Sequence, residues 1–495
     1  MSTLERESRH APEEALHLLL ASADDHQPVL DAGLAPDAAS NAPKPTQLPR
    51  RTEALSWERP DASPNDLPAQ RWGIIASEGD EGEAFLRAIT PLIQHREKEQ
   101  GAPVRTYRVP PNMDAAASVK WRDQVYRAED VPQEERPRYL LLLGDLHHIS
   151  IEFQHVLAHS AFVGRLHCAR PSGSPELAGY TAYAHKVLAS ETSAETPEAP
   201  DVLLYTAQDG SAATTLGHQL LMEPCRDVME KQWKPKHPAM RLQPLPYDNA
   251  GSEGLLRAAS EARSGVMLSI THGLGQPKRG WASVEEQRAM QGALKIAAGQ
   301  CLTGDALRST PFLPGGMWFC VACFGAATPP RSAFQAWLEL LAREQAYAGR
   351  PEAVLKSIPK SGERPFLAAL PQALLANPQG PLAIIGHSDL AWTYGYVEPT
   401  DVYRSRASRI TSALEVLANG SRAGVALDAL MRFYRDVNES LMADYQARQE
   451  ALTFGQPDPV EPRSLGHRWM LRNDLRGYIL LGDPAARLAL RRTPA

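Results

Sequence analysis

The chain has 495 residues, of which 43% are hydrophobic and 22% charged, and its formal net charge is -6 at pH 7. A chain of this length has room for two to four domains, each with a core of its own. Because the chain is mildly acidic without a basic block, we expect no nucleic-acid partner, and because apolar runs such as 139–143 are too short to span a bilayer, we expect no membrane partner.

Residues 1–68 are predicted to form a flexible or loosely docked extension, since they are rich in Ala, Pro, Asp and Ser and contain one short leucine run at 18–20. Acidic residues near the start and the brevity of that run are not typical of a secretory signal, which predicts a cytoplasmic protein. The Arg50-Arg51 pair has two interpretations, a processing site or part of a solvated linker.

Residues 69–200 are predicted to form an α/β subdomain. Short apolar runs alternate here with helical patterns, which is typical of a parallel sheet. The run over 139–143 is apolar on both faces, as a central parallel strand should be. The predicted strands lie at 72–76, 104–109, 139–143 and 162–166. One predicted helix has Phe85, Ile89 and Leu92 on one face, and another covers 178–190.

The segment 144–152 follows the central strand at its carboxyl end, where open α/β sheets bind ligands. His147 and His148 lie in it, but adjacent side chains diverge and no carboxylate and histidine set completes a group of metal ligands. We therefore expect no metal in this segment.

The cysteines do not form a disulfide framework, because there are only five of them in so long a chain. Cys320 and Cys323 have a Cys-x-x-Cys spacing, but no second Cys/His pair accompanies them, so we expect no zinc site and no cofactor. The other three are Cys168, Cys225 and Cys301.

Residues 201–495 continue the alternation of strands and helices. A strand over 202–206 and a helix over 215–222 come first, then helices over 255–262 and 284–298 on either side of an apolar run at 266–270. Later come an amphipathic helix around 334–341, a buried strand over 381–386, a long helix with an apolar stripe from Leu427 to Leu441, and a last strand at 478–481. The stripe predicts packing, with a partner surface as the alternative.

Two stretches of this region, VMLSITHGLG (266–275) and MWFCVACFGAATP (317–329), carry the candidate chemistry. Each is an apolar run of strand length that ends in small residues and exposes one reactive side chain, His272 or Cys323. A thiolate is a strong nucleophile, and an adjacent imidazole can accept the thiol proton. We therefore predict a catalytic dyad of Cys323 and His272. The N–H groups of Gly273 and Cys323 are the candidates for an oxyanion hole.

Cys320 is not the predicted nucleophile. Side chains alternate between the two faces of a strand, so Cys320 should lie on the face opposite the one shared by Val321 and Cys323. A competing interpretation is a serine hydrolase built on Gly386-His387-Ser388-Asp389, but the nucleophile elbow requires Gly-x-Ser-x-Gly and Leu390 stands at its last position.

The residues around the predicted dyad carry a resemblance. Ile270-Thr271-His272-Gly273 and Ala322-Cys323-Phe324-Gly325 are similar to the His-Gly and Ala-Cys-x-Gly signatures of caspase-like (clan CD) cysteine peptidases, particularly the gingipain-like and CHAT families. Shorter stretches also resemble gingipain landmarks in the family's order, at 139–145, 163–166, 175–177, 180–188 and 478–484.

The resemblance implies a caspase-like three-layer α/β fold with a mainly parallel central sheet and two α/β subdomains. Residues 69–200 would be the N-terminal subdomain. Residues 201–495 would be the catalytic subdomain with a C-terminal helical elaboration.

The resemblance also implies substrate contacts. In gingipain-like enzymes acidic residues near the position of Glu152 orient the catalytic histidine or bind a basic substrate side chain. The segment after the 381–386 strand lines the primary specificity pocket in caspase-like folds, which makes Asp389 and Trp392 candidates. Asp389 has the alternative of capping a turn, and Trp392 that of packing in the core.

The predicted function is that of a cysteine endopeptidase that forms a thioester acyl-enzyme and needs no cofactor. Its partners would be a protein or peptide substrate and an activating or inhibitory protein. The lack of a secretory signal favours a restricted, regulatory intracellular protease, and relatives of the CHAT kind imply bacterial defence or programmed cell death. The alternative is a catalytically silent caspase-fold scaffold that binds partners.

Overall fold

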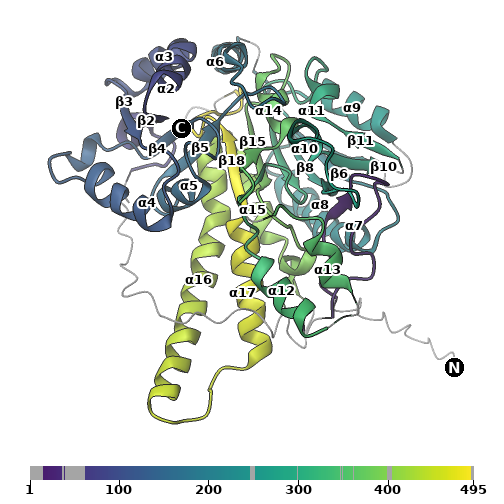
Figure 1. The fold of residues 1–495 in the computed structure, drawn as a ribbon. Helices are drawn as coiled ribbons and strands as arrows, with labels where there is room; N and C mark the ends of the chain where they lie inside the picture. Colours follow the sequence, from purple (N-terminus) through teal and green to yellow (C-terminus); the bar gives the residue numbers. More distant parts are fainter. Residues whose placement is uncertain are drawn as a thin grey trace.

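The computed structural model describes residues 15–35, 38 and 62–491, except 195, 246–250, 298, 346, 348, 361 and 399–403. Figure 1 shows the chain as a ribbon. The Arg50-Arg51 pair lies outside the described residues. In the described part of the chain, no helix combines the length and apolarity needed to cross a membrane.

A ten-stranded sheet forms the centre of the molecule. From one edge to the other its strands are β3 (Arg105–Val109), β2 (Trp72–Ser77), β4 (Tyr139–Leu143), β5 (Phe162–Leu166), β18 (Tyr478–Gly482), β15 (Ala383–His387), β12 (Met317–Val321), β8 (Val266–Ile270), β6 (Asp201–Thr206) and β7 (Arg241–Pro244).

The sheet consists of two parallel groups that run in opposite directions. Strands β3, β2, β4 and β5 are parallel to one another, as are β15, β12, β8, β6 and β7. Between them β18 pairs parallel with β5 and antiparallel with β15. Along the strand direction, the carboxyl ends of the strands in one group therefore lie at the opposite end of the sheet from those in the other group.

Helices cover both faces of the sheet and complete three layers. One apolar cluster packs α2 (Asp80–Ala88), α3 (Thr90–Gln100), α6 (Leu177–Glu191), α9 (Gly251–Glu261) and α14 (Ala369–Ala376) on one face. On the other face lie α4 (Ala115–Trp121), α5 (Ile151–Leu157), α8 (Glu223–Val228), α12 (Gln335–Arg343), α15 (Ser408–Ala418), α16 (Ala423–Thr453) and α17 (Pro462–Arg476). The predicted three-layer α/β fold with a mainly parallel sheet is confirmed.

The long helix α16 and its neighbour α17 lie side by side and extend well beyond the sheet (Figure 1). The predicted apolar stripe packs where α16 crosses the sheet, since Leu427, Leu430 and Tyr434 are buried there. Farther out, Leu441 and Tyr445 pack against Leu465 of α17.

A second, smaller sheet lies beside the second group of strands. Its order is β1 (Leu20–Ser22), β9 (His272–Gly275), β10 (Leu294–Ala297) and β11 (Gln300–Leu302). The helix predicted over 284–298 is wrong in its second half, because α10 (Val284–Met290) ends early and β10 follows. Gly292 has a φ of +82°, and a Cβ there would lie 2.2 Å from the carbonyl oxygen of Phe324. This close approach requires glycine and turns the chain out of the helix.

The start of the chain packs into the molecule in its described part, where the sequence predicted a flexible or loosely docked extension. Leu16, Leu18, Leu19 and Leu20 are all fully buried. Strand β1 pairs parallel with β9, so residues close to the N-terminus lie against the strand that begins at His272.

Candidate active site

Cys323 lies in a tight turn directly after β12. Side chains in β12 alternate as predicted, so that Phe319, Val321 and Cys323 belong to one apolar cluster and Cys320 belongs to the cluster on the opposite face. Phe324 has a φ of +54°, a left-handed conformation that is strained for a bulky residue. Its N–H donates to the carbonyl oxygen of Asp389 at 2.9 Å, which holds the turn in place.

His272 reaches the same place from the neighbouring strand. Val321 of β12 pairs with Ile270 of β8, so two adjacent parallel strands end side by side, and His272 and Cys323 each follow by two residues. A Cβ on Gly273 would lie 1.8 Å from the carbonyl oxygen of Cys323. The His-Gly and Cys segments are thus in direct backbone contact, and only glycine permits that contact.

The sequence analysis missed an acidic partner of His272. Oδ2 of Asp209 lies 2.7 Å from Nδ1 of His272, and neither side chain is exposed to solvent. Asp209 follows β6, which is the neighbour of β8 in the sheet. An acid after a strand of the same parallel group was the available signal, because open α/β sheets gather ligand-binding residues at such ends.

Asp209 is held in its ionised form. Burial opposes ionisation, but the contact with His272, the hydrogen bond from the Thr214 hydroxyl and the charge of Lys295 together hold the Asp209 pKa well below its usual range. The Thr214 hydroxyl donates to Oδ1 at 2.7 Å, and Nζ of Lys295 lies 3.4 Å from Oδ2.

Both ring nitrogens of His272 are buried, and Nε2, unlike Nδ1, has neither a hydrogen-bond partner nor an ion-pair partner among the described residues. An unpartnered buried nitrogen is costly, and such groups in native structures often serve chemistry. With Nδ1 directed at Asp209, Nε2 is the atom that can accept a proton from a neighbouring group.

The thiol of Cys323 is fully buried. The backbone N–H of Ala391 donates to Sγ at 3.2 Å. Burial, with the nearby negative charges of Asp389 and Asp474, raises the Cys323 pKa well above its usual value, and the Ala391 N–H only partly opposes this. In this conformation the sulfur is therefore a protonated thiol.

Two backbone N–H groups converge beside the thiol. Gly273 N–H and Cys323 N–H both donate to the carbonyl oxygen of Leu19, at 3.0 Å and 3.2 Å. These are the two groups predicted for an oxyanion hole, and they can bind one oxygen together.

Asp389 and Trp392 lie close to Cys323, but their side chains point into the fold. The Asp389 carboxylate accepts the N–H groups of Ala333 at 2.7 Å and Leu390 at 2.8 Å, and burial raises its pKa to about 6. The Trp392 ring is buried against Phe334, with a centroid distance of 5.8 Å. These arrangements favour the capping and core alternatives for the two side chains.

Glu152 is not brought together with the dyad. It lies in α5 and forms an ion pair with Arg476 at 2.6 Å. A surface pocket is lined by Glu152 and Asp389, but Cys323 and His272 are not part of its lining. In this conformation Asp209, and not Glu152, lies against His272.

The serine-hydrolase alternative is not supported by the environment of Ser388. The Ser388 hydroxyl donates to the carbonyl oxygen of Gly477 at 2.9 Å. Both ring nitrogens of the neighbouring His387 lie 2.9 Å from backbone carbonyl oxygens, those of Asp389 and Asp474. These contacts engage the Ser388 hydroxyl and both nitrogens of the His387 ring with backbone groups.

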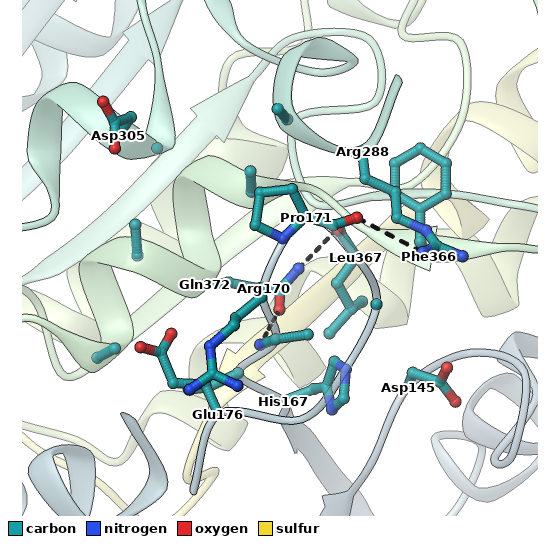
Figure 2. A pocket seen from close by; sticks show the side chains of 18 of the residues that line it. Asp145, His167, Arg170, Pro171, Glu176, Arg288, Asp305, Phe366, Leu367 and Gln372 are labelled. Atoms are coloured by element: carbon teal, nitrogen blue, oxygen red, sulfur yellow. Dashed lines mark hydrogen bonds between the residues drawn. The ribbon is translucent and has the colours of Figure 1, made fainter. Parts of the chain in front are cut away.

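A further cavity is lined in part by His167 and Cys168, which follow β5, and Figure 2 shows side chains that line it. Asp145, His167, Glu176 and Arg288 are part of its lining, whereas Cys323 and His272 are not. Two ion pairs lie in its lining, between Asp145 and Arg364 at 2.6 Å and between Glu176 and Arg308 at 3.1 Å. This cavity therefore does not belong to the dyad.

A group with metal-ligand geometry, His95, Glu99 and Glu191, occurs in the described part of the chain. Arg96 lies 2.6 Å from Glu99 and 2.7 Å from Glu191, so a cation already occupies the centre of the group. The cluster is a half-buried ion-pair network around Arg96, and His147 and His148 lie outside it.

Comparison with known proteins concerns the fold. No protein-family profile and no curated protein matches the chain in sequence. The structure is similar to the crystal structure of the Arg-specific cysteine proteinase gingipain R, with 12% identity and a TM-score of 0.50, covering 87% of this chain and 82% of that one. Despite the low identity, the match shows that this chain has a gingipain-like caspase fold, as the motifs predicted.

Two further solved structures also match. One is described only as a protease, with 13% identity, a TM-score of 0.47, and coverage of 84% of this chain and 78% of its own. The other is the complex of the pro- and mature domains of RgpB from Porphyromonas gingivalis, with 13% identity, a TM-score of 0.46, and coverage of 85% and 81%.

Proposed function

We propose that this chain is a cysteine endopeptidase with Cys323 as nucleophile and His272 as general base. The observation that carries the proposal is the convergence of the Gly273 and Cys323 N–H groups on one carbonyl oxygen, next to a thiol and to a histidine held by an acid. Acyl transfer needs a nucleophile, a base and donors for the developing oxyanion, and each has a candidate here.

In the proposed reaction, Nε2 of His272 accepts the thiol proton and Sγ attacks the substrate carbonyl carbon. The two N–H groups stabilise the oxyanion, and His272 then protonates the leaving amine. A thioester on Cys323 remains, which water hydrolyses with His272 as base. Asp209 positions the imidazole and stabilises its charged form, so it acts through His272 and not on the substrate.

The proposal extends to the setting of the enzyme. We infer a restricted, regulated peptidase and not a digestive one, because Cys323 is fully buried in this conformation and must be uncovered before it can react with another protein. The resemblance to CHAT-type peptidases adds an intracellular role in bacterial defence or cell death, under the control of a protein partner. Residues 69–200 and 201–495 would form the two subdomains of such an enzyme.

The test uses the full chain with a fluorogenic peptide library and a labelled iodoacetamide probe. We expect hydrolysis of some library members by the wild type, none by Cys323→Ala, and preferential labelling of Cys323 over the other four cysteines once the site opens. Cys320→Ala is the matched control and should retain hydrolysis. Equal labelling of all five cysteines without hydrolysis would favour the catalytically silent scaffold.

A further inference from the structure

Residues 17–20 lie across the candidate active site as an extended strand. The Leu19 N–H donates to the Ala391 carbonyl at 3.2 Å, and the Thr393 N–H donates to the His17 carbonyl at 3.1 Å. Leu18 forms an antiparallel bridge with Trp392 between these two bonds. The segment after β15 thus pairs with a stretch of its own chain by main-chain hydrogen bonds, which is how an extended peptide adds to a strand edge.

One residue of this stretch has the environment of a reacting group. The Leu19 carbonyl oxygen accepts both the Gly273 N–H and the Cys323 N–H, so it occupies the candidate oxyanion hole. The Leu19 N–H and Sγ of Cys323 both contact the backbone of Ala391. Beyond Leu19 the chain continues along β9, with Leu20 opposite Gly273. The Leu19–Leu20 peptide bond therefore lies beside Cys323.

We propose that residues 17–20 are bound as a substrate, that the enzyme selects leucine on the amino side of the bond it cuts, and that the first bond cut is its own Leu19–Leu20 bond. The inference rests on the proposed function and adds the substrate class and the first event of activation.

The preference for leucine follows from the surroundings of Leu19. Its side chain is fully buried and belongs to the same apolar cluster as Phe324, Trp392 and Tyr396. A charged side chain placed there would lose its hydration without gaining a partner.

The carboxylates close to this site are already engaged. Asp209 contacts His272 and Lys295, Asp389 accepts two backbone N–H groups, and Asp474 accepts the Trp392 N–H at 2.9 Å. They give an incoming arginine or lysine little to bind. The expected selectivity therefore differs from the arginine specificity of gingipain R.

The first turnover follows from the same geometry. Sγ of Cys323 bonds to the carbonyl carbon of Leu19 as its proton passes to His272. The carbon–nitrogen bond to Leu20 breaks, and His272 gives that proton to the Leu20 nitrogen. Water then supplies a hydroxyl to the Leu19 carbon and a proton to the sulfur, which leaves a free carboxylate at Leu19 and a free amine at Leu20.

The first experiment follows the full chain by intact mass spectrometry during incubation at neutral pH. The wild type should give a fragment that begins at Leu20, and Cys323→Ala should stay intact. Leu19→Met keeps a similar apolar shape and should be cut within a few-fold of the wild-type rate. Leu19→Arg should be cut at least ten times more slowly. A wild-type chain that stays intact, or that is cut only at other bonds, would overturn the proposal.

The second experiment presents the same sequence in trans. A fluorogenic peptide spanning Ala15 to Ala23 is compared with versions that carry Met, Arg or Asp at the position of Leu19. Leucine should exceed arginine and aspartate at least tenfold in kcat/KM. Cys323-dependent cleavage with arginine or aspartate preferred would overturn this inference and leave the proposed function standing. Loss of all Cys323-dependent hydrolysis would overturn both.

Discussion

Two aspartates, one in each half of the sheet, lie against a histidine, and the surroundings of the two pairs differ. In the first half, Oδ1 of Asp145 lies 2.9 Å from Nδ1 of His148, Arg364 binds the same carboxylate, and an open cavity adjoins (Figure 2). In the second half, Asp209 and His272 are in contact and neither side chain is exposed to solvent, and residues 17–20 cover the candidate site next to them.

The two pairs differ in how fully their polar groups are bonded. The Asp145 carboxylate accepts the His147 and His148 N–H groups as well as Arg364, which is the pattern of a structural anchor. His272 retains a buried nitrogen without a partner in the described part of the molecule. Searching for cavities therefore does not locate this candidate site, because residues 17–20 of the same chain fill it.

The largest expected effect comes from removing the nucleophile or the base. Cys323→Ala and His272→Ala should each lower kcat/KM for the best library peptide by at least about 10³-fold, because the pair acts as a unit. The double variant should be no worse than either single variant. A double variant that loses the product of the two single effects would show that the residues act independently.

The next largest loss of activity is expected from replacing Asp209, with Asp145 as the comparison. Asp209→Asn should lower kcat by about 10²-fold to 10⁴-fold, since the amide favours the wrong imidazole tautomer. Asp145→Asn, the matched control, should leave kcat within about threefold. An Asp145→Asn variant with the greater loss of kcat would reverse the assignment of the two halves.

The pH dependence of stability should have one sign for Asp145 and the opposite sign for two buried carboxylates of the second half, Asp389 and Asp474. Burial opposes ionisation of Asp145, but the charge of His167, the His148 N–H and Arg364 outweigh it and lower the Asp145 pKa. Its contribution to stability is therefore present above about pH 4 and lost as the pH falls below.

Asp389 and Asp474 behave in the opposite way, because burial raises their pKa values to about 6 and about 7. The folded state binds their protons more tightly than the unfolded state, so stability falls as the pH rises from about 4 to 7. Asp389→Asn should remove about 2 kcal/mol of the fall between pH 4.5 and pH 7. Urea unfolding of the wild type and the variant at pH 4.5 and pH 7 measures this change. If the free energy of unfolding falls by the same amount between the two pH values in both proteins, the burial argument is contradicted.

The smallest effect is expected at Glu152. Its ion pair with Arg476 is partly exposed and contributes about 0.5 kcal/mol. Glu152→Gln should leave kcat/KM and the order of preferred peptides unchanged within about twofold. A loss confined to peptides with arginine or lysine before the cleaved bond would restore the role that the sequence suggested for this residue.

Features with a local cause could be predicted from the sequence. The strands at 139–143 and 162–166 are found with those limits, because continuous apolar runs of this length are typical of buried parallel strands. The alternation of side chains in β12 distinguished Cys323 from Cys320. His272 and Cys323 could be paired because both follow apolar runs that end in small residues.

Features that depend on long-range neighbours could not be predicted. Asp209 contacts His272 only because β6 and β8 are adjacent in the sheet, and the order of strands cannot be predicted from the sequence of a single segment. Leu19 is separated from Cys323 by most of the chain, and its leucine run alone is no more than an amphipathic pattern. Glu152 was associated with the dyad only through the resemblance to gingipain-like enzymes, and the sequence alone does not show that it forms an ion pair with Arg476.

The position of β18 has a consequence for the making of the protein. This strand joins the two groups of the sheet, between β5 and β15, yet its residues follow all the other strands of that sheet in the chain. During synthesis both groups emerge before the strand that joins them, each with an open strand edge that can pair with other chains. Until β18 (Tyr478–Gly482) has emerged from the ribosome, each half of the sheet therefore keeps an open strand edge, and the need for chaperones should last until this strand has paired.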